Sequence, residues 1–358
     1  MERDNCIEIP NIEQELKSLV EKNKEQNRVR ACLFNLIIYT NEEHRKIHLK
    51  EMIPLIIQNF PCRIIFIQNE KNSKENLLKV SISSEIFDQG ETSIACDQIT
   101  IKVSGNHLNS VTYLIPSLIV TDLPINVLWG EDLTFENQIL TYLQNFATKI
   151  IFTTDNIVDL HKFSVKMLDT VKNSKVEVVD MQWTFLNSWR NVFTEVFDSS
   201  ERIKQLRNAK EISITINRLE NNSIHFCEIQ SLYLQAWLAS RMEWNFKAIN
   251  RSSDFTEITY SSPNGTVNFH LTYGNNKELL CGSIIGIEVE GESHFHVSMI
   301  RRIAAKNIVL HITEESMCLL PYTLPFSDNI DGFNFMKQVF YGIPSPHYQS
   351  MLEQLIKI

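Results

Sequence analysis

Five carboxylates lie at the ends of predicted strands or helices: Asp122, Glu131, Asp132, Asp180 and Asp198. Pockets of α/β folds form at such ends. A carboxylate paired with a second carboxylate or a histidine can transfer protons there. Aspartates also cap helices and form turns without any catalytic role. We favour the structural interpretation and predict no catalytic residue.

Two histidine pairs have spacings that suit a metal ion. His44 and His48 lie one turn apart on a predicted helix. Arg45 and Lys46 stand between them and disfavour a dication. His294 and His296 are predicted to share one face of a strand, but no third ligand accompanies them. The sequence therefore predicts no metal site.

Glycine is scarce, with 10 residues of 358, and the first is Gly90. The dinucleotide fingerprint and the phosphate loop both need several glycines close together. Gly286 and Gly291 have the spacing of the phosphate loop, but Glu292-Ser293 follows where Lys-Ser or Lys-Thr is needed. We predict no cofactor and no tight binding of NAD(P) or ATP.

The net charge, the cysteine spacing and the lack of long apolar runs limit the classes of protein to which this chain can belong. From the net charge of −9 and the lack of a basic run, we expect no nucleic-acid partner. Seven cysteines lie at least 26 positions apart, which is typical of free thiols in a reducing cytosol. Neither a signal peptide nor an uninterrupted apolar run of about 20 residues is visible. We expect a soluble, cytoplasmic protein with no membrane contact.

The elements of the first half alternate between strands and helices. Strands are predicted at Val29–Thr40, Arg63–Ile67, Pro124–Trp129, Lys149–Thr154 and Val176–Val179. Helices are predicted between them, with Pro54 shortening one and Pro116 ending another. This alternation predicts an α/β N-terminal domain with a mostly parallel sheet over residues 1–180.

The pattern changes from about residue 181. A long helix is predicted at Ile224–Glu243, followed by short strands between turn signals over Asn245–Ile312. The sequence Asn264-Gly265 is a strong hairpin signal. We predict an α+β C-terminal domain with an antiparallel meander over residues 181–358, packed without a flexible linker.

Four arginines lie within otherwise apolar segments: Arg30, Arg63, Arg190 and Arg241. A buried guanidinium needs a partner, so intrachain ion pairs are favoured and binding of an anion is the alternative. Tryptophan and arginine are also the residue types enriched at interface hot spots.

Five segments together resemble one family. They are Arg30-Ala31 before LFNLIIY, Pro61-Cys62-Arg63 before IIFI, Ile115–Leu118 through Asp122-Leu123-Pro124 to Trp129, Asp180–Trp183 through Trp189-Arg190 to Phe197-Asp198, and Trp237–Arg241 with Trp244. In this order the chain resembles the glucose-6-phosphate dehydrogenase assembly protein OpcA family over roughly residues 10–250. The family's late cysteine pair, associated with thioredoxin control, is not matched, because only Cys318 lies in that region.

The resemblance implies a bacterial, non-catalytic assembly factor and allosteric activator of glucose-6-phosphate dehydrogenase in the oxidative pentose phosphate pathway. It selects Trp129, Arg190 and Arg241 as candidate partner-binding residues. Two alternatives stay open. One is a sugar-phosphate-binding enzyme with Arg30 or Arg63 as the anion-binding group, and the other is a passive protein scaffold.

Overall fold

The computed structural model describes residues 11–41, 43–71, 73, 75–89, 92–152, 154, 157–218, 228–252, 255–314, 317–326, 333–342 and 345–358. Within these ranges the side chains of residues 43–45, 47, 48, 89, 92, 317 and 333–335 are not described.

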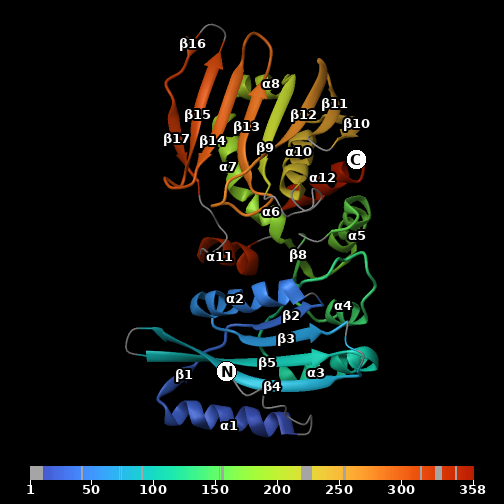
Figure 1. Cartoon of the computed structure of the whole chain (residues 1–358), viewed down its shortest axis with the longest axis vertical. Helices are drawn as coiled ribbons and strands as arrows, with labels where there is room; N and C mark the ends of the chain where they lie inside the picture. Colours follow the sequence, from blue (N-terminus) through green and yellow to red (C-terminus); the bar gives the residue numbers. More distant parts are fainter. Residues whose placement is uncertain are drawn as a thin grey trace. The chain divides into compact units, whose positions relative to one another are not determined.

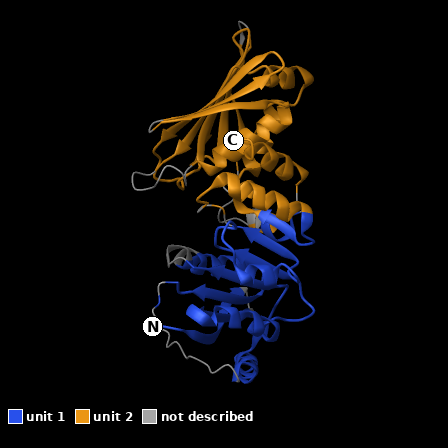
Figure 2. Cartoon of the chain, turned by 90° about the vertical axis from the view of Figure 1, so that its right-hand side faces the viewer, with its two compact units in different colours: residues 1–153, 173–179, 339–342 blue, residues 154–172, 180–338, 343–358 orange. Residues whose placement is uncertain are grey.

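The chain divides into two compact units (Figure 2). Unit 1 comprises residues 1–153, 173–179 and 339–342, and unit 2 comprises residues 154–172, 180–338 and 343–358. The units follow spatial packing, so unit 1 includes residues 339–342 from beyond residue 180 and unit 2 includes residues 154–172 from before it. The division into domains 1–180 and 181–358 stays a prediction.

The first sheet has eight strands in the order β1-β5-β3-β2-β6-β7-β8, with β4 paired to β5 (Figure 1). Its strands are β1 (Arg28–Arg30), β2 (Asn35–Thr40), β3 (Arg63–Asn69), β4 (Leu78–Gln89), β5 (Thr92–Val103), β6 (Ile125–Trp129), β7 (Lys149–Phe152) and β8 (Glu177–Asp180). The pair β4–β5 is antiparallel, whereas β1–β5, β3–β5, β2–β3, β2–β6 and β6–β7 are parallel. The predicted mostly parallel sheet is confirmed.

Strands β2, β3 and β6 form the centre of this sheet, and every residue in them is buried. Their apolar side chains on both alternations are what a strand covered on both faces requires. The run predicted as one strand at Val29–Thr40 is two strands. Its first part pairs with β5, and its second part lies between β3 and β6.

The helices near this sheet tolerate proline better than the sequence predicts. They are α1 (Ile12–Glu25), α2 (Glu43–Asn59), the 3-10 helix η2 (Gly105–Ser110), α3 (Val111–Leu118) and α4 (Gln138–Leu143). Helix α2 continues through Pro54 to Asn59, and α3 ends two residues after Pro116.

The second sheet has nine strands in the order β10-β11-β12-β9-β13-β14-β15-β16, with β17 paired to β15. Its strands are β9 (Glu211–Asn217), β10 (Asn245–Arg251), β11 (Thr256–Ser262), β12 (Gly265–Gly274), β13 (Ile284–Glu290), β14 (His296–Arg302), β15 (Asn307–Glu314), β16 (Met317–Cys318) and β17 (Tyr322–Pro325). Only β9–β12 is parallel among these pairs. The predicted α+β half with an antiparallel meander is confirmed, including the hairpin that Ser262 and Gly265 close.

Helices α7, α8 and α10 lie along one face of the second sheet (Figure 1). The helices of this half are α5 (Leu160–Asn173), α6 (Met181–Phe185), α7 (Asn187–Val196), α8 (Ser200–Arg207), α10 (Ile229–Met242), α11 (Phe333–Tyr341) and α12 (Pro346–Leu355). Helix α10 is buried along almost its whole length because most of its residues are apolar, and its buried Ser231 and Gln235 donate to backbone carbonyls. The part of its predicted range at residues 224–227 lies outside the described residues.

The structure also bears on the predictions about the cysteines and about membrane-spanning segments. Cys32, Cys62, Cys96 and Cys318 are free thiols, but Cys281 is disulfide-bonded, so the expectation of free thiols is wrong for that residue. Among the described residues, no helix is long and apolar enough to cross a membrane.

Candidate functional site

Arg30 and Arg63 meet at one carboxylate. Arg63 is the first residue of β3, and its Nη2 lies 2.7 Å from Asp97 Oδ2 in β5. Arg30, at the end of β1, donates to the same oxygen. Arg63 Nη1 also donates to the carbonyl of Leu118 at 3.0 Å. The parallel strands therefore bring the two arginines together at a buried counter-ion that sequence reasoning missed.

This arrangement favours the intrachain interpretation of both arginines. Asp97 is 3% exposed and Arg63 is 8% exposed, so their charges compensate each other away from water. Binding of an anion by Arg30 or Arg63 stays a prediction, and it would have to compete with Asp97. Asp97 is the only acidic residue of β5 (Thr92–Val103), and this is the sequence signal that could have found the partner.

A second polar group, here called the carboxyl-edge cluster, lies where β2, β3 and β6 end. It consists of Tyr39, Asn41, Asn69, Lys71, Trp129, Glu131 and Asn137. Strand order reverses between β2 and β6, which makes this edge the switch point where open α/β sheets bind ligands.

Glu131 is the centre of the carboxyl-edge cluster. Its carboxylate accepts hydrogen bonds from Lys71 Nζ at 2.6 Å, from Asn137 Nδ2 at 2.7 Å and from Asn41 Nδ2. Glu131 is 6% exposed. A buried carboxylate at this position repels a phosphate. The sequence has no glycine-rich loop here that could bind a phosphate instead.

Trp129 and Tyr39 pack together beneath the same edge. Their rings stack with centroids 4.1 Å apart. The Tyr39 hydroxyl accepts from Asn69 Nδ2 at 2.9 Å and from Asn137 Nδ2 at 3.0 Å. Burial, together with the charge of Glu131, raises the pKa of Tyr39 to about 12. Trp129 is 1% exposed, so a partner could touch it only after this packing had opened.

Asp180 organises the helices of unit 2. It caps α6 by accepting from the backbone N–H groups of Gln182 and Trp183. It also accepts from Tyr233 of α10 and Tyr348 of α12, each at 2.8 Å, and from Thr154 Oγ1 at 3.0 Å. Burial raises the pKa of Asp180, and the three hydroxyl donors act in the opposite direction. The carboxylate is fully occupied and holds α6, α10 and α12 together.

The third feature, here called the basic cluster, consists of Arg190, Arg241 and His347. Arg190 of α7 stacks on the Trp183 ring, with its guanidinium carbon 3.6 Å from the ring centroid. The Trp183 ring lies 5.6 Å from that of Tyr348, the neighbour of His347 at the start of α12. Arg241 comes from the last turn of α10, which packs against α12.

Electrostatics connects the three members of the basic cluster. Loss of water around the ring, together with the charges of Arg241 and Arg190, lowers the pKa of His347. Desolvation lowers the pKa of Arg190 to about 9. Arg190 and Arg241, two of the residues that the sequence selected, thus both disfavour the charged form of His347, which the sequence did not select.

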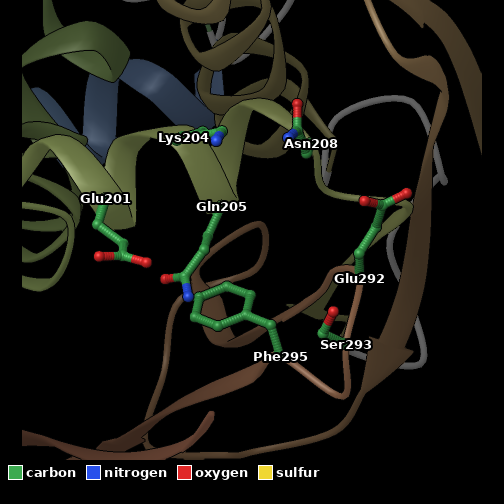
Figure 3. Close-up of a pocket in the computed structure, with 7 residues that line it drawn as sticks. All are labelled: Glu201, Lys204, Gln205, Asn208, Glu292, Ser293 and Phe295. Carbon is green, nitrogen blue, oxygen red and sulfur yellow. The ribbon is translucent and has the colours of Figure 1, made fainter. Parts of the chain in front are cut away.

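A pair of cavities adjoins the second sheet. The first, of about 190 Å³, is lined by Glu201, Lys204, Gln205, Asn208, Glu292, Ser293 and Phe295 (Figure 3). The second, of about 290 Å³, shares Asn208 and Glu292 with it. Ser293 and His294 both have a positive φ, 54° and 59°, in the loop between β13 and β14. The charged side chains of the first cavity are the exposed Glu201 and Glu292 and the single Lys204. This set does not resemble a catalytic site.

The remaining candidates do not form a reactive group. Asp132 accepts from the backbone of Thr134 in a turn, and Asp122 and Asp198 are exposed. His294 lies in the turn before β14, so the prediction that it shares a strand face with His296 is wrong. The side chains of His44 and His48 lie outside the described residues. In the part of the chain that the structure describes, no group of three or more His, Cys, Asp or Glu side chains could hold a metal ion.

Comparison with known families identifies the chain. Residues 55–167 match the model for the glucose-6-phosphate dehydrogenase subunit N-terminal domain, and residues 176–303 match the model for its C-terminal domain. Both are OpcA domains. The chain belongs to the OpcA family.

Two curated OpcA proteins are similar to the chain. The OxPP cycle protein OpcA of Nostoc punctiforme is 26% identical over 202 residues, which is 56% of this chain and 42% of that protein. The protein of the same name in Synechocystis is 25% identical over 179 residues, covering 50% of this chain and 34% of that protein. The chain thus spans less than half the length of the curated relatives it matches.

Solved structures share the fold at very low identity. KijD10, a 3-ketoreductase from Actinomadura kijaniata in complex with TDP-benzene and NADP, has a TM-score of 0.51 at 10% identity, covering 92% of this chain and 95% of that one. An oxidoreductase from Bacillus cereus has a TM-score of 0.51 at 8% identity, covering 90% and 94%. These likenesses show that this OpcA chain has the fold of such oxidoreductases.

Proposed function

We propose that this protein is a non-catalytic assembly factor and allosteric activator of a glucose-6-phosphate dehydrogenase. Support comes from both halves of the chain, since each matches a domain described as a subunit of that enzyme. A role in the oxidative pentose phosphate pathway follows from the same names and from those of the curated relatives. With a metabolic enzyme as its partner, we expect the protein in the cytoplasm.

The observation that most supports a non-catalytic role is the carboxyl-edge cluster. KijD10 is a reductase in complex with NADP, and this chain shares its fold. Here the switch point of the sheet holds Glu131 and its amide and lysine donors, with no glycine loop beside them. A dinucleotide would have to displace buried hydrogen bonds and meet a negative charge.

The proposed activation follows from preferential binding. A partner shifts an equilibrium between two states of an enzyme only if it binds one state more tightly. The protein should therefore contact a dehydrogenase surface that differs between the inactive and the active, assembled state. Reciprocally, the assembled dehydrogenase should bind this protein more tightly than the dissociated one does.

Arg190 and Arg241 stay our proposed partner-binding residues. Arg241 is exposed, and neither guanidinium forms an ion pair with any described residue. Trp129 also stays among the proposed partner-binding residues. Because its side chain is buried, it would contact the partner only after its packing had opened.

One mixing experiment separates this proposal from its two alternatives. The purified protein is combined with the dehydrogenase of the same organism, and both the mass of the complex and the rate of the dehydrogenase are measured. We expect a larger complex together with a higher rate. A complex without a rate change would support the passive scaffold instead. Turnover of a sugar phosphate by this protein alone would support the enzyme alternative.

A further inference from the structure

The two adjoining cavities of unit 2, here called the double cavity, share Asn208 and Glu292. The first, of about 190 Å³, lies between α8 and the loop that joins β13 to β14 (Figure 3). The second, of about 290 Å³, lies between the segment that follows α8 and the turn of the β11–β12 hairpin. Their combined volume falls within the range of small-ligand pockets, roughly 300–1,000 Å³.

The first cavity contains an acceptor without a donor. Gln205 extends from α8 toward Phe295 (Figure 3), and its Oε1 is buried but accepts no hydrogen bond from any residue that the structure describes. Leaving a buried amide oxygen unpaired is unfavourable. The carboxylates of Glu201 and Glu292, which line the same cavity, can also only accept. This cavity therefore selects a ligand that supplies hydrogen-bond donors.

The second cavity is lined by amides and hydroxyls. Asn264 donates from Nδ2 to Asn208 Oδ1 at 2.7 Å, so the other half of each amide, Asn208 Nδ2 and Asn264 Oδ1, stays available. The Asn268 amide and the Ser262 hydroxyl line the same cavity. Each of these groups can both donate and accept, as the hydroxyl groups of a sugar do.

The charges that line the double cavity are balanced. They are the exposed side chains of Glu201, Glu292, Lys204 and Lys210, and none forms an ion pair with a residue that the structure describes. A phosphate would meet two carboxylates and the Gln205 oxygen, and a cation would meet two ammonium groups. The lining therefore favours an uncharged ligand that carries many hydroxyl groups.

We propose that the double cavity binds an uncharged saccharide of two linked rings. One ring lies in each cavity, and Asn208 and Glu292 contact both rings because they line both cavities. Hydroxyl groups of one ring donate to Gln205 Oε1 and Glu292, and a hydroxyl of the other accepts from Asn208 Nδ2. This binding goes beyond the proposed function and does not rest on it.

Saturation-transfer NMR and calorimetry on the full chain, without any dehydrogenase, test the site. The probes are maltose, sucrose and trehalose, with glucose, glucose 6-phosphate and spermidine for comparison. We expect at least one disaccharide to bind more tightly than glucose, and the charged probes not to bind. Binding of spermidine alone or of glucose 6-phosphate alone would show a charge site and overturn the proposal. So would the absence of binding by all three disaccharides.

Substitutions locate the binding. Glu292→Gln should weaken the binding of the disaccharide by about tenfold, the effect of losing a charge-assisted hydrogen bond. Gln205→Met removes the amide oxygen at similar length and should weaken binding by about fivefold. Glu278→Gln is the matched control, because this exposed glutamate follows the end of β12 away from Gly265 and lines neither cavity. Equal losses in Glu292→Gln and Glu278→Gln would contradict the site.

Thermal unfolding separates binding from folding. Gln205→Met removes a buried acceptor that has no partner, so the Tm of the variant without saccharide should equal or exceed that of the wild type. The rise in Tm that the disaccharide gives the wild type should be smaller in the variant. A lower Tm without saccharide, with an unchanged affinity, would assign Gln205 to the fold and contradict its role in binding. The saccharide test and the dehydrogenase test are separate measurements, so either can fail alone.

Discussion

At the scale of single residues, Asp180 accepts more hydrogen bonds than any other side chain in the described part of unit 2. Its carboxylate is buried and accepts the hydroxyls of Tyr233, Tyr348 and Thr154. Because ionisation in a buried place is unfavourable, burial raises its pKa. This unfavourable contribution applies above the folded-state pKa and disappears as the pH falls through it. The donors offset part of the cost.

Removing one donor should therefore destabilise the protein. Tyr233→Phe leaves a buried carboxylate oxygen with one hydrogen bond fewer, and should lower the free energy of unfolding by about 1–3 kcal/mol. Urea unfolding followed by tryptophan fluorescence measures the change. Tyr142→Phe is the control, since the Tyr142 ring packs on Phe146 and its hydroxyl forms no hydrogen bond with the residues that the structure describes. Equal losses in both variants would contradict this role of Asp180.

His347 gives a prediction with a definite sign. Desolvation and the charges of Arg241 and Arg190 disfavour its protonated form. Its pKa, measured by NMR titration of the imidazole, should lie below the usual value of about 6.5. Arg241→Gln removes one positive charge and should raise that pKa. Because the folded state binds this proton more weakly than the unfolded state, the histidine contributes nothing to stability above about pH 6.5 and disfavours folding as the pH falls below it. If the pKa of His347 is the same in Arg241→Gln as in the wild type, the charge of Arg241 does not act on His347, and this prediction is wrong.

At the scale of elements, the carboxyl edge of the first sheet predicts no nucleotide binding. Glu131, Lys71 and Asn137 occupy the switch point with their own hydrogen bonds. Calorimetry with NAD, NADP and ATP should show no binding in the micromolar range. Micromolar affinity for any of them would mean that the cluster opens to admit a ligand, and would weaken the non-catalytic proposal.

The sequence predicts β2, β3 and β6 because they are apolar runs, as central strands buried on both faces require. The sequence does not predict which strands pair with one another. The sequence Val29–Thr40 reads as one strand, yet β1 pairs with β5 and β2 pairs with β3. Nothing in local alternation records which neighbour a strand takes.

The candidate sites show the same limit. Trp129 was selected for its chemistry, but an aromatic ring has the same chemistry in a core and at an interface, and here it is buried. Arg190 and Arg241 were also selected from the sequence. His347 was not, because it lies more than 100 residues along the chain from Arg241 and only the packing of α10 on α12 brings them near.

At the scale of the whole molecule, the chain has the fold of oxidoreductases and belongs to a family named for a dehydrogenase subunit. In the proposed function, the protein acts on a dehydrogenase by binding one of its states rather than by binding a nucleotide itself. Such activation must saturate, because it ends when every enzyme molecule is bound.

The most direct test of this account follows the assembly and the rate of the dehydrogenase together. A fixed concentration of the dehydrogenase of the same organism is titrated with this protein. Sedimentation velocity measures the assembled fraction, and NADPH formation measures the rate. The account predicts that both rise together and saturate at the same concentration of added protein. If a high concentration changes neither the assembled fraction nor the rate, the proposed function is wrong.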